Sequence, residues 1–155
     1  MQITKFSSST IDIINTYRSA NGDSMELLNN LINITSEERT SLITGDFNIC
    51  YQINQSNRLI QGLDQRGFSQ LVNEATHIQG RHIDHVYWRD RTCTWSEPDI
   101  ERYSPYYSDH DAICVTIKKK SDTWENENSA QKSQQIEYAI LLHKKKYWNL
   151  KIWGL

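Results

Sequence analysis

The sequence predicts an α+β fold, and three stretches carry this prediction. Residues 10–16 alternate in polarity and are rich in β-branched side chains, which is typical of a strand. Residues 25–32 place leucine and isoleucine side chains along one stripe, which predicts an amphipathic helix. Residues 112–117 form an uninterrupted apolar run of strand length, which predicts a buried strand.

The composition is that of one ordinary folded domain. The chain has 155 residues, of which 37% are hydrophobic and 23% charged, with a formal net charge of −2. This balance does not favour a nucleic-acid coat or a membrane-surface protein, but it is compatible with a nuclease that has a local basic rim. No apolar run approaches the ~18 residues of a membrane span, and residues 1–9 lack the apolar core of a secretory signal.

Three cysteines bear on the compartment. Cys50, Cys93 and Cys114 are an odd number and lack metal-ligand spacing. They predict reduced thiols in an intracellular protein, either nuclear or cytoplasmic.

Local signals predict the other elements in order. Residues 2–6 are expected to pair with residues 10–16 as a hairpin, with the three serines at 7–9 as its turn. Asp23 or Ser24 is expected to cap the helix over 25–32, which joins two strands into an α/β unit. The remaining expected elements are a strand at 40–44, a helix at 57–65, an extended segment at 68–72, a strand at 81–88 and short strands at 92–95 and 99–103.

Polar side chains stand on or beside three of the expected strands. Carboxylates suit a hard cation such as Mg²⁺, and an amide can both donate to and accept from a phosphate or a water. Each group also has an ordinary alternative, as part of a turn or as a buried acid satisfied by a neighbouring His or Arg. The groups are Asp46 and Asn48 after the strand at 40–44, Asp84 within the strand at 81–88, and Asp109 and His110 before the strand at 112–117.

Alternation along a strand makes two further predictions about these groups. It places Asp46 and Asn48 on one side, with Phe47 pointing into the core on the other. It also places His85 on the opposite face from Asp84.

Taken together, these motifs resemble one family. The chain is similar to the endonuclease/exonuclease/phosphatase family of Mg²⁺-dependent phosphodiesterases, which includes apurinic and retroelement endonucleases. Thr76 and His77 before the Ile-Asp strand look like the retrotransposon-like branch. The resemblance covers residues 1–118. It rests on Thr-Gly-Asp-Phe-Asn at 44–48, Ile-Asp-His-Val at 83–86, Tyr-Ser-Asp-His-Asp-Ala-Ile at 107–113, and Asn-Thr-Tyr-Arg-Ser at 15–19 as a tyrosine-bearing loop.

The resemblance implies metal-dependent hydrolysis of a phosphodiester, with DNA as the favoured substrate. It implies Mg²⁺ as the cofactor, with Mn²⁺ as an alternative, and it leaves the identity of the general base open. The implied roles are metal binding or water positioning for Asp46, phosphate binding for Asn48 and His110, fixing of the His110 tautomer for Asp84, metal binding or base catalysis for Asp109, phosphate or leaving-group contact for Tyr17, and assistance in substrate binding for Arg18.

The resemblance also implies a fold and a missing part. Residues 1–118 are expected to be the C-terminal half of a four-layer α/β sandwich, a mostly antiparallel sheet with helices on its outer face. The family's metal-binding Glu belongs to the other half, so the chain alone is expected to be weak or inactive. Without that half, the inner apolar face of the sheet is expected to be exposed and prone to association.

Two other functions remain open from the sequence. The chain can be a non-catalytic remnant or interaction module of the same fold, completed by a partner that supplies the N-terminal half. Alternatively, the substrate can be a phospholipid or phosphoinositide. DNA is favoured because the segment from Thr76 to Tyr87 resembles element-encoded endonucleases. Four arginines are expected to contact the nucleic-acid backbone or to be ordinary surface residues: Arg81, Arg89, Arg91 and Arg102.

The composition changes after residue 118. Residues 119–155 are assigned no function, with a polar linker at 121–135 and a short helix expected at 135–148. The basic run at 143–146 is expected to be a solvated turn, with contact to phosphate or lipid head groups as the alternative.

Overall fold

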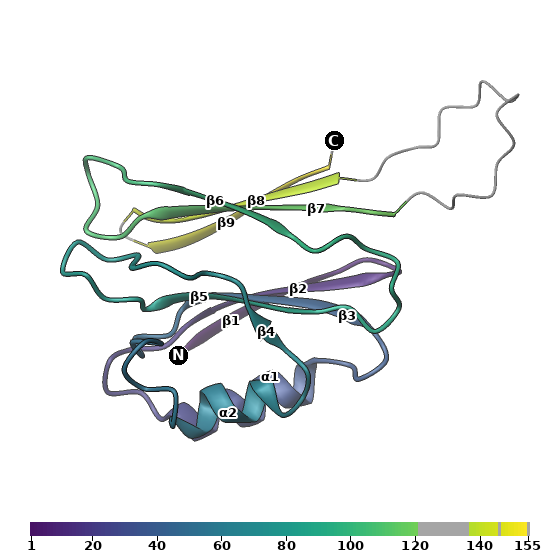
Figure 1. Ribbon diagram of the computed structural model, residues 1–155, viewed down its shortest axis with the longest axis horizontal. Coiled ribbons are helices and arrows are strands. Elements are labelled where there is room, and N and C mark those ends of the chain that lie inside the picture. The colour runs from purple at the N-terminus through teal and green to yellow at the C-terminus, as the bar shows by residue number, and fades with distance from the viewer. Residues whose placement is uncertain (121–136, 146, 155) are drawn as a thin grey trace, which may run out of the picture.

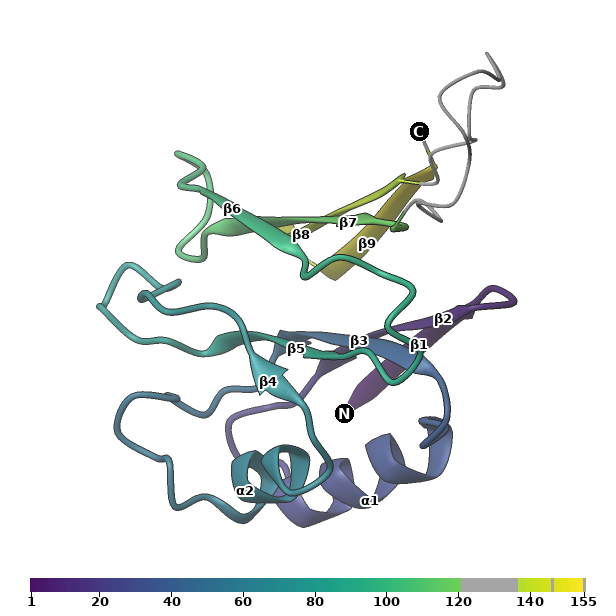
Figure 2. The same ribbon diagram turned by 45° about the vertical axis from the view of Figure 1, so that its right-hand side comes forward.

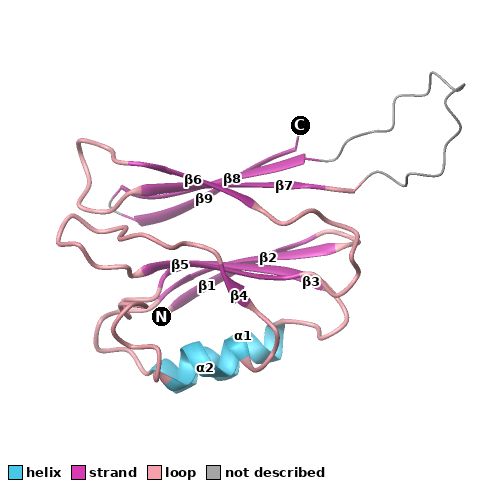
Figure 3. Cartoon of the chain, viewed as in Figure 1, coloured by secondary structure: helices cyan, strands magenta, loops and turns pink. Residues whose placement is uncertain are grey.

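The chain folds into two stacked sheets with two helices beneath one of them. The computed structural model describes residues 1–120, 137–145 and 147–154. Within these residues the fold is α+β, with a mixed sheet of five strands, a second sheet of four strands and two helices (Figures 1 and 3). The elements are β1 Gln2–Ser7, β2 Ile11–Tyr17, α1 Ser24–Ile34, β3 Thr40–Asp46, α2 Arg58–Asp64, β4 Ser69–Gln70, β5 Asp84–Arg89, β6 Asp99–Tyr103, β7 Ala112–Lys118, β8 Glu137–Lys145 and β9 Tyr147–Gly154.

The first sheet has the strand order β1-β2-β3-β5-β4. The hairpin expected at the N-terminus is present, because β1 and β2 pair antiparallel. The strands β2 and β3 are parallel and joined through α1, whereas β5 pairs antiparallel with both β3 and β4. In this register Tyr17, Asp46 and Asp84 are neighbours across three strands. They form one row across the sheet, where β2 and β3 end and β5 begins.

Both helices cover the outer face of the first sheet. The Asp23 carboxylate caps α1 by accepting from the Met25 N–H at 2.8 Å, and Asn57 caps α2 by accepting from the Leu59 N–H at 2.9 Å. The apolar stripe of α1 is buried at Leu27, Leu28 and Leu31. These side chains join a core that also contains Ile14, Ile43, Phe47, Leu59, Leu63 and Tyr87.

The inner face of the first sheet is covered by the second sheet, which corrects the expectation that it is exposed. Figure 2 shows β6 to β9 stacked over β1 to β5, on the side away from the helices. Apolar side chains from β7 fill the space between the sheets against those of β2, β3 and β5. This inter-sheet core contains Ile11, Ile13, Leu42, Val86, Trp88, Trp95, Ile113, Val115 and Ile117.

The helix expected at residues 135–148 is wrong, since this segment contributes the strand β8 and the start of β9. The two strands extend the second sheet in the order β6-β7-β8-β9, and β8 pairs antiparallel with β7. An uncovered β7 would present a row of unpaired backbone donors and acceptors, which β8 satisfies. This long-range pairing overrides the local helical pattern. The linker expected at residues 121–135 lies outside the described residues.

The strand expected at 92–95 is replaced by a side-chain-capped turn. The Asp90 carboxylate accepts from the Thr92 N–H at 3.0 Å and from the Trp95 N–H at 3.1 Å. It also accepts from the Thr40 hydroxyl at 2.5 Å. Such local bonds compete with strand pairing. Within residues 92–95, all of which the structure describes, the one bridge to another segment is the isolated bridge between Trp95 and Lys119.

The described part of the chain contains no helix of the length and apolar character that crossing a membrane requires.

Candidate functional site

A buried carboxylate–imidazole pair lies where the two sheets meet. Asp84 begins β5, and His110 lies in the loop that leads into β7. The His110 Nδ1 atom is 2.9 Å and 3.2 Å from the two carboxylate oxygens of Asp84, so the hydrogen bond expected between them is present. Both residues are buried, with relative exposures of 1% and 4%. The carboxylate holds the proton on Nδ1, which gives Nε2 the lone pair of the neutral ring.

Thr76 fixes the carboxylate of this pair. Its hydroxyl donates to Asp84 Oδ2 at 2.6 Å and accepts from the Asp84 N–H at 3.1 Å. Thr76 is fully buried, so these bonds face no competition from water. The sequence indicates Thr76 only through the family resemblance. No local sequence pattern predicts its hydrogen bond to Asp84.

Asp46 stands next to the pair on the neighbouring strand. It is the last residue of β3, opposite Asp84 in the register, and is 1% exposed. Ligand atoms of Asp46, Asp84 and His110 all lie within 4.8 Å of one another. Two carboxylates and an imidazole this close can hold a divalent cation.

The backbone that delivers Asp46 depends on a glycine. Gly45 has a φ of 140°, and a Cβ built on it would lie 1.8 Å from the Thr16 carbonyl oxygen. A larger residue would therefore push β3 away from β2 directly before Asp46.

Strand alternation does not set the direction of Asn48, because Asn48 lies beyond the end of β3. The strand ends at Asp46, and Asn48 has a φ of 49°, a left-handed conformation that asparagine tolerates. Its backbone N–H donates to Asp46 Oδ1 at 2.9 Å, and its side-chain amide donates to the Arg18 carbonyl at 2.8 Å. Phe47 does point into the core, as expected.

Arg18 holds the same loop from the other side. Its guanidinium donates to the carbonyls of Phe47 at 2.6 Å and Asn48 at 2.9 Å, and it also contacts the Gly22 carbonyl. Burial lowers the pKa of Arg18, and the nearby Asp46 carboxylate opposes that shift. These contacts make Arg18 a residue that positions the loop. Tyr17 lies beside Asp46 at the end of β2 and is partly exposed.

His85 supports this loop from beneath, on the face opposite Asp84. Its ring stacks on Phe47 at a centroid distance of 4.7 Å, and its Nε2 donates to the Ile49 carbonyl at 2.8 Å. Its Nδ1 is 3.2 Å from the Tyr87 hydroxyl, which donates to it. Complete burial lowers the pKa of His85 from 6.5 to about 3, so the ring is neutral at ordinary pH.

Asp109 lies in a different group from Asp46. Its side chain is 59% exposed, and its Oδ2 is 3.5 Å from His77 Nε2. The His77 Nδ1 accepts from the Gln79 N–H at 3.1 Å, so the neutral ring carries its proton on Nε2, toward Asp109. His77 also meets His110 edge to face, with a centroid distance of 4.8 Å.

The described structure thus separates the two predicted metal ligands. Asp46 groups with Asp84 and His110, whereas Asp109 groups with His77 and His110. The second group is a poor metal site, because the proton on His77 Nε2 occupies the lone-pair direction that a metal ion needs.

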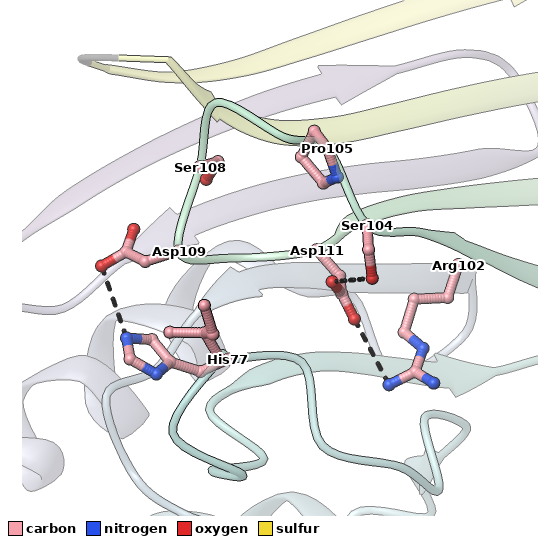
Figure 4. Close-up of a pocket in the computed structure, with 8 residues that line it drawn as sticks. His77, Arg102, Ser104, Pro105, Ser108, Asp109 and Asp111 are labelled. Atoms are coloured by element: carbon pink, nitrogen blue, oxygen red, sulfur yellow. Dashed lines mark hydrogen bonds and ion pairs between the residues drawn. The ribbon is translucent and has the colours of Figure 1, made fainter.

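A cavity opens beside Asp109. Its volume is about 300 Å³, and it lies between the loop that precedes β7 and the segment that carries His77 (Figure 4). Arg102 reaches Asp111 across it at 3.3 Å, and the Ser104 hydroxyl donates to the same carboxylate at 2.6 Å. Backbone bonds join its two walls, from Ile78 N–H to the Asp109 carbonyl at 2.9 Å and from Asp111 N–H to the Thr76 carbonyl at 2.8 Å.

The four arginines expected to contact a nucleic-acid backbone differ in position. Arg89 is 3% exposed, donates to the Ser36 carbonyl at 2.5 Å and lies over the Phe68 ring, so it is a structural residue. Arg102 bonds Glu74 and Asp111. Arg81 is exposed and stands next to the His77 ring. Arg91 is exposed and donates to the Arg66 carbonyl at 3.2 Å.

Comparison with protein-family models, curated protein sequences and solved structures found no match for this chain.

Proposed function

We propose that the chain carries the phosphate-binding part of a metal-dependent phosphodiesterase site and that its substrate is DNA. The observation that supports this most strongly is the buried Asp84–His110 pair beside Asp46 at one edge of the first sheet. A carboxylate stabilises the charged form of an imidazole that it contacts. His110 can therefore donate a charge-assisted hydrogen bond from Nε2 to a phosphate oxygen.

The donor set fits a divalent cation. Asp46 and Asp84 offer carboxylate oxygens, and Mg²⁺ commonly takes one or two carboxylates and completes its shell with water and substrate phosphate. Mn²⁺ is a second fit, because it is also bound by carboxylate and water oxygens. When bound, the ion would stabilise negative charge on the phosphate.

Other residues of the chain are proposed to assist. Tyr17 lies next to Asp46 in the sheet, where its hydroxyl can donate to the phosphate or to the leaving oxygen. Arg18 and Asn48 shape the loop after β3 through their mutual bonds. Either Asp46 or the exposed Asp109 can act as the base that takes a proton from water.

The stacked sheets with helices on one outer face support a finer description of the fold. We propose that they are the C-terminal half of a four-layer α/β sandwich. A carboxylate supplied by another segment or chain would add to the two in the Asp46 group and strengthen cation binding. The three free thiols, Cys50, Cys93 and Cys114, fit a reducing intracellular compartment.

The test is nicking of supercoiled plasmid DNA by the purified chain with Mg²⁺ or Mn²⁺, with a chelator as the metal-free control. We expect weak, metal-dependent nicking that falls roughly 10²- to 10⁴-fold in His110→Ala. Asp84→Asn should fall similarly, whereas the exposed Asp99→Asn serves as the matched control. Nicking that survives in His110→Ala would contradict the proposal.

Two further outcomes would redirect the proposal. Release of phosphocholine or inositol phosphates from lipid substrates, without DNA nicking, would assign the same site to a phospholipid. Absence of both activities in a chain that is folded by circular dichroism would favour a non-catalytic module.

A further inference from the structure

An exposed tyrosine pair lies three and four residues before the proposed phosphate-binding histidine. Tyr106 is 99% exposed and Tyr107 53% exposed, in the loop between β6 and β7 that also contains His110. Their rings meet edge to face, with centroids 5.2 Å apart. Pro105 and Ser108, on either side of the pair, line the cavity beside Asp109.

A second segment adds to this exposed apolar surface. Ile78 is 82% exposed, and its backbone N–H donates to the Asp109 carbonyl at 2.9 Å. Exposed apolar side chains therefore stand on two segments that are far apart in the sequence and are joined at Asp109 by this backbone bond. Single exposed apolar residues are common, but a group of them beside a candidate site indicates a contact surface.

We propose that Tyr106, Tyr107 and Ile78 form a base-stacking surface for unpaired nucleotides next to the phosphate held at His110. This inference rests on the proposed function and names the form of its substrate, which is single-stranded or locally unpaired DNA. Aromatic side chains stack on any base, because every base has a π face.

Chain geometry places the surface at a suitable reach. Three residues of extended chain span at most about 11 Å, so the Tyr107 backbone lies within about 11 Å of His110. Bases in a stacked strand follow one another at about 3.4 Å. The ring of Tyr107 can therefore meet a base within about three nucleotides of the phosphate at His110.

The exposed rings favour bases as the occupant. The loop from Ser104 to Asp111 contains two aspartates and no lysine or arginine, and the preceding Arg102 is paired with Glu74 and Asp111. These carboxylates repel the phosphates of DNA and an anionic membrane alike, so charge does not separate the two. The attraction at this loop comes from contact between the aromatic rings and the bases.

The test is binding of the full-length chain, with a chelator present, to three fluorescent probes. These are a single-stranded thymidine oligonucleotide, an abasic strand of equal length and charge, and a duplex. We expect the thymidine strand to bind most tightly. Tyr106→Ala combined with Tyr107→Ala should weaken its binding about 5- to 150-fold while leaving the abasic strand unchanged.

Phe6→Ala is the matched control, because Phe6 is also aromatic and is 40% exposed. Phe6 pairs with Ile13 on β2, which lies four residues before Tyr17, so it is away from the row of Tyr17, Asp46 and Asp84. Equal binding of the thymidine and abasic strands would overturn the inference. Tyrosine-dependent binding to phosphatidylserine vesicles, without base-dependent binding, would overturn it as well.

The outcome is separable from that of the proposed hydrolysis. Base-dependent binding without nicking would support the stacking surface and contradict the catalytic proposal. Nicking that depends on His110, with a tyrosine double variant that binds normally, would support the catalytic proposal and overturn the stacking surface.

Discussion

Acidification should destabilise the protein through His85, whose ring is neutral in the folded chain. The ring is fully buried, and its pKa is lowered from 6.5 to about 3. The unfolded chain binds a proton at this residue as the pH falls through 6.5, whereas the folded chain does not. Stability is therefore fully present above about pH 6.5 and decreases as the pH falls toward about 3.

The magnitude follows from the size of the shift. Each pH unit between the two pKa values removes about 1.4 kcal/mol, so the loss between pH 8 and pH 5 is about 2 kcal/mol from His85 alone. Burial also lowers the pKa of His77 and His82, which adds to the loss with the same sign. Carboxylates of ordinary pKa contribute little above about pH 5.

Urea denaturation followed by tryptophan fluorescence at several pH values measures this dependence. His85→Gln is the informative variant, because it retains an amide donor for the Ile49 carbonyl but does not titrate. We expect it to be less stable than the wild type at pH 8 and to lose about 2 kcal/mol less on transfer to pH 5. An unchanged pH dependence in this variant would refute the assignment to His85. If the variant does not fold, the ring of His85 in the native wild type can be titrated by NMR, where a pKa near 6.5 would refute it equally.

Two substitutions test how the site is held in place. Gly45→Ala should lower the thermal melting point markedly, with a loss of at least about 2 kcal/mol, because its Cβ would lie 1.8 Å from the Thr16 carbonyl oxygen; a melting point equal to that of the wild type would contradict this. Thr76→Val keeps the side-chain shape but removes the 2.6 Å bond to Asp84, so we expect a loss of about 1–3 kcal/mol in denaturant titration. The same variant should show a nicking rate that falls by a larger factor than its folded fraction, whereas an equal fall in both would assign Thr76 a purely structural role.

Sequence periodicity predicted the first sheet well because its signals are local. β-branched residues at 10–16 predict a strand and the leucine stripe predicts the buried face of α1, and neither signal depends on distant partners. The polar positions of β2 are buried as well, which alternation did not predict. The contact between Asp84 and His110 was also predicted. That prediction came from several motifs taken together, since no single residue was sufficient to indicate it. Their catalytic roles remain predictions.

The features missed by sequence reasoning depend on contacts between distant segments. β8 pairs with β7 through backbone groups, so its helix-like side-chain pattern gave no warning. Asn48 lies beyond the strand, where its amide donates to the carbonyl of Arg18, thirty residues away. Thr76 acquires its partner only when the chain folds back along β5.

The position of the Asp84–His110 pair ties chemistry to the docking of the two sheets. Asp84 belongs to a strand of the first sheet, whereas His110 leads into the central region of the second. A relative displacement of about 1 Å would stretch their 2.9 Å contact beyond hydrogen-bonding distance, even with every strand intact. The packing of the two sheets against each other therefore sets the tautomer of His110. Any ligand that separates the sheets would act as an inhibitor without contacting the site.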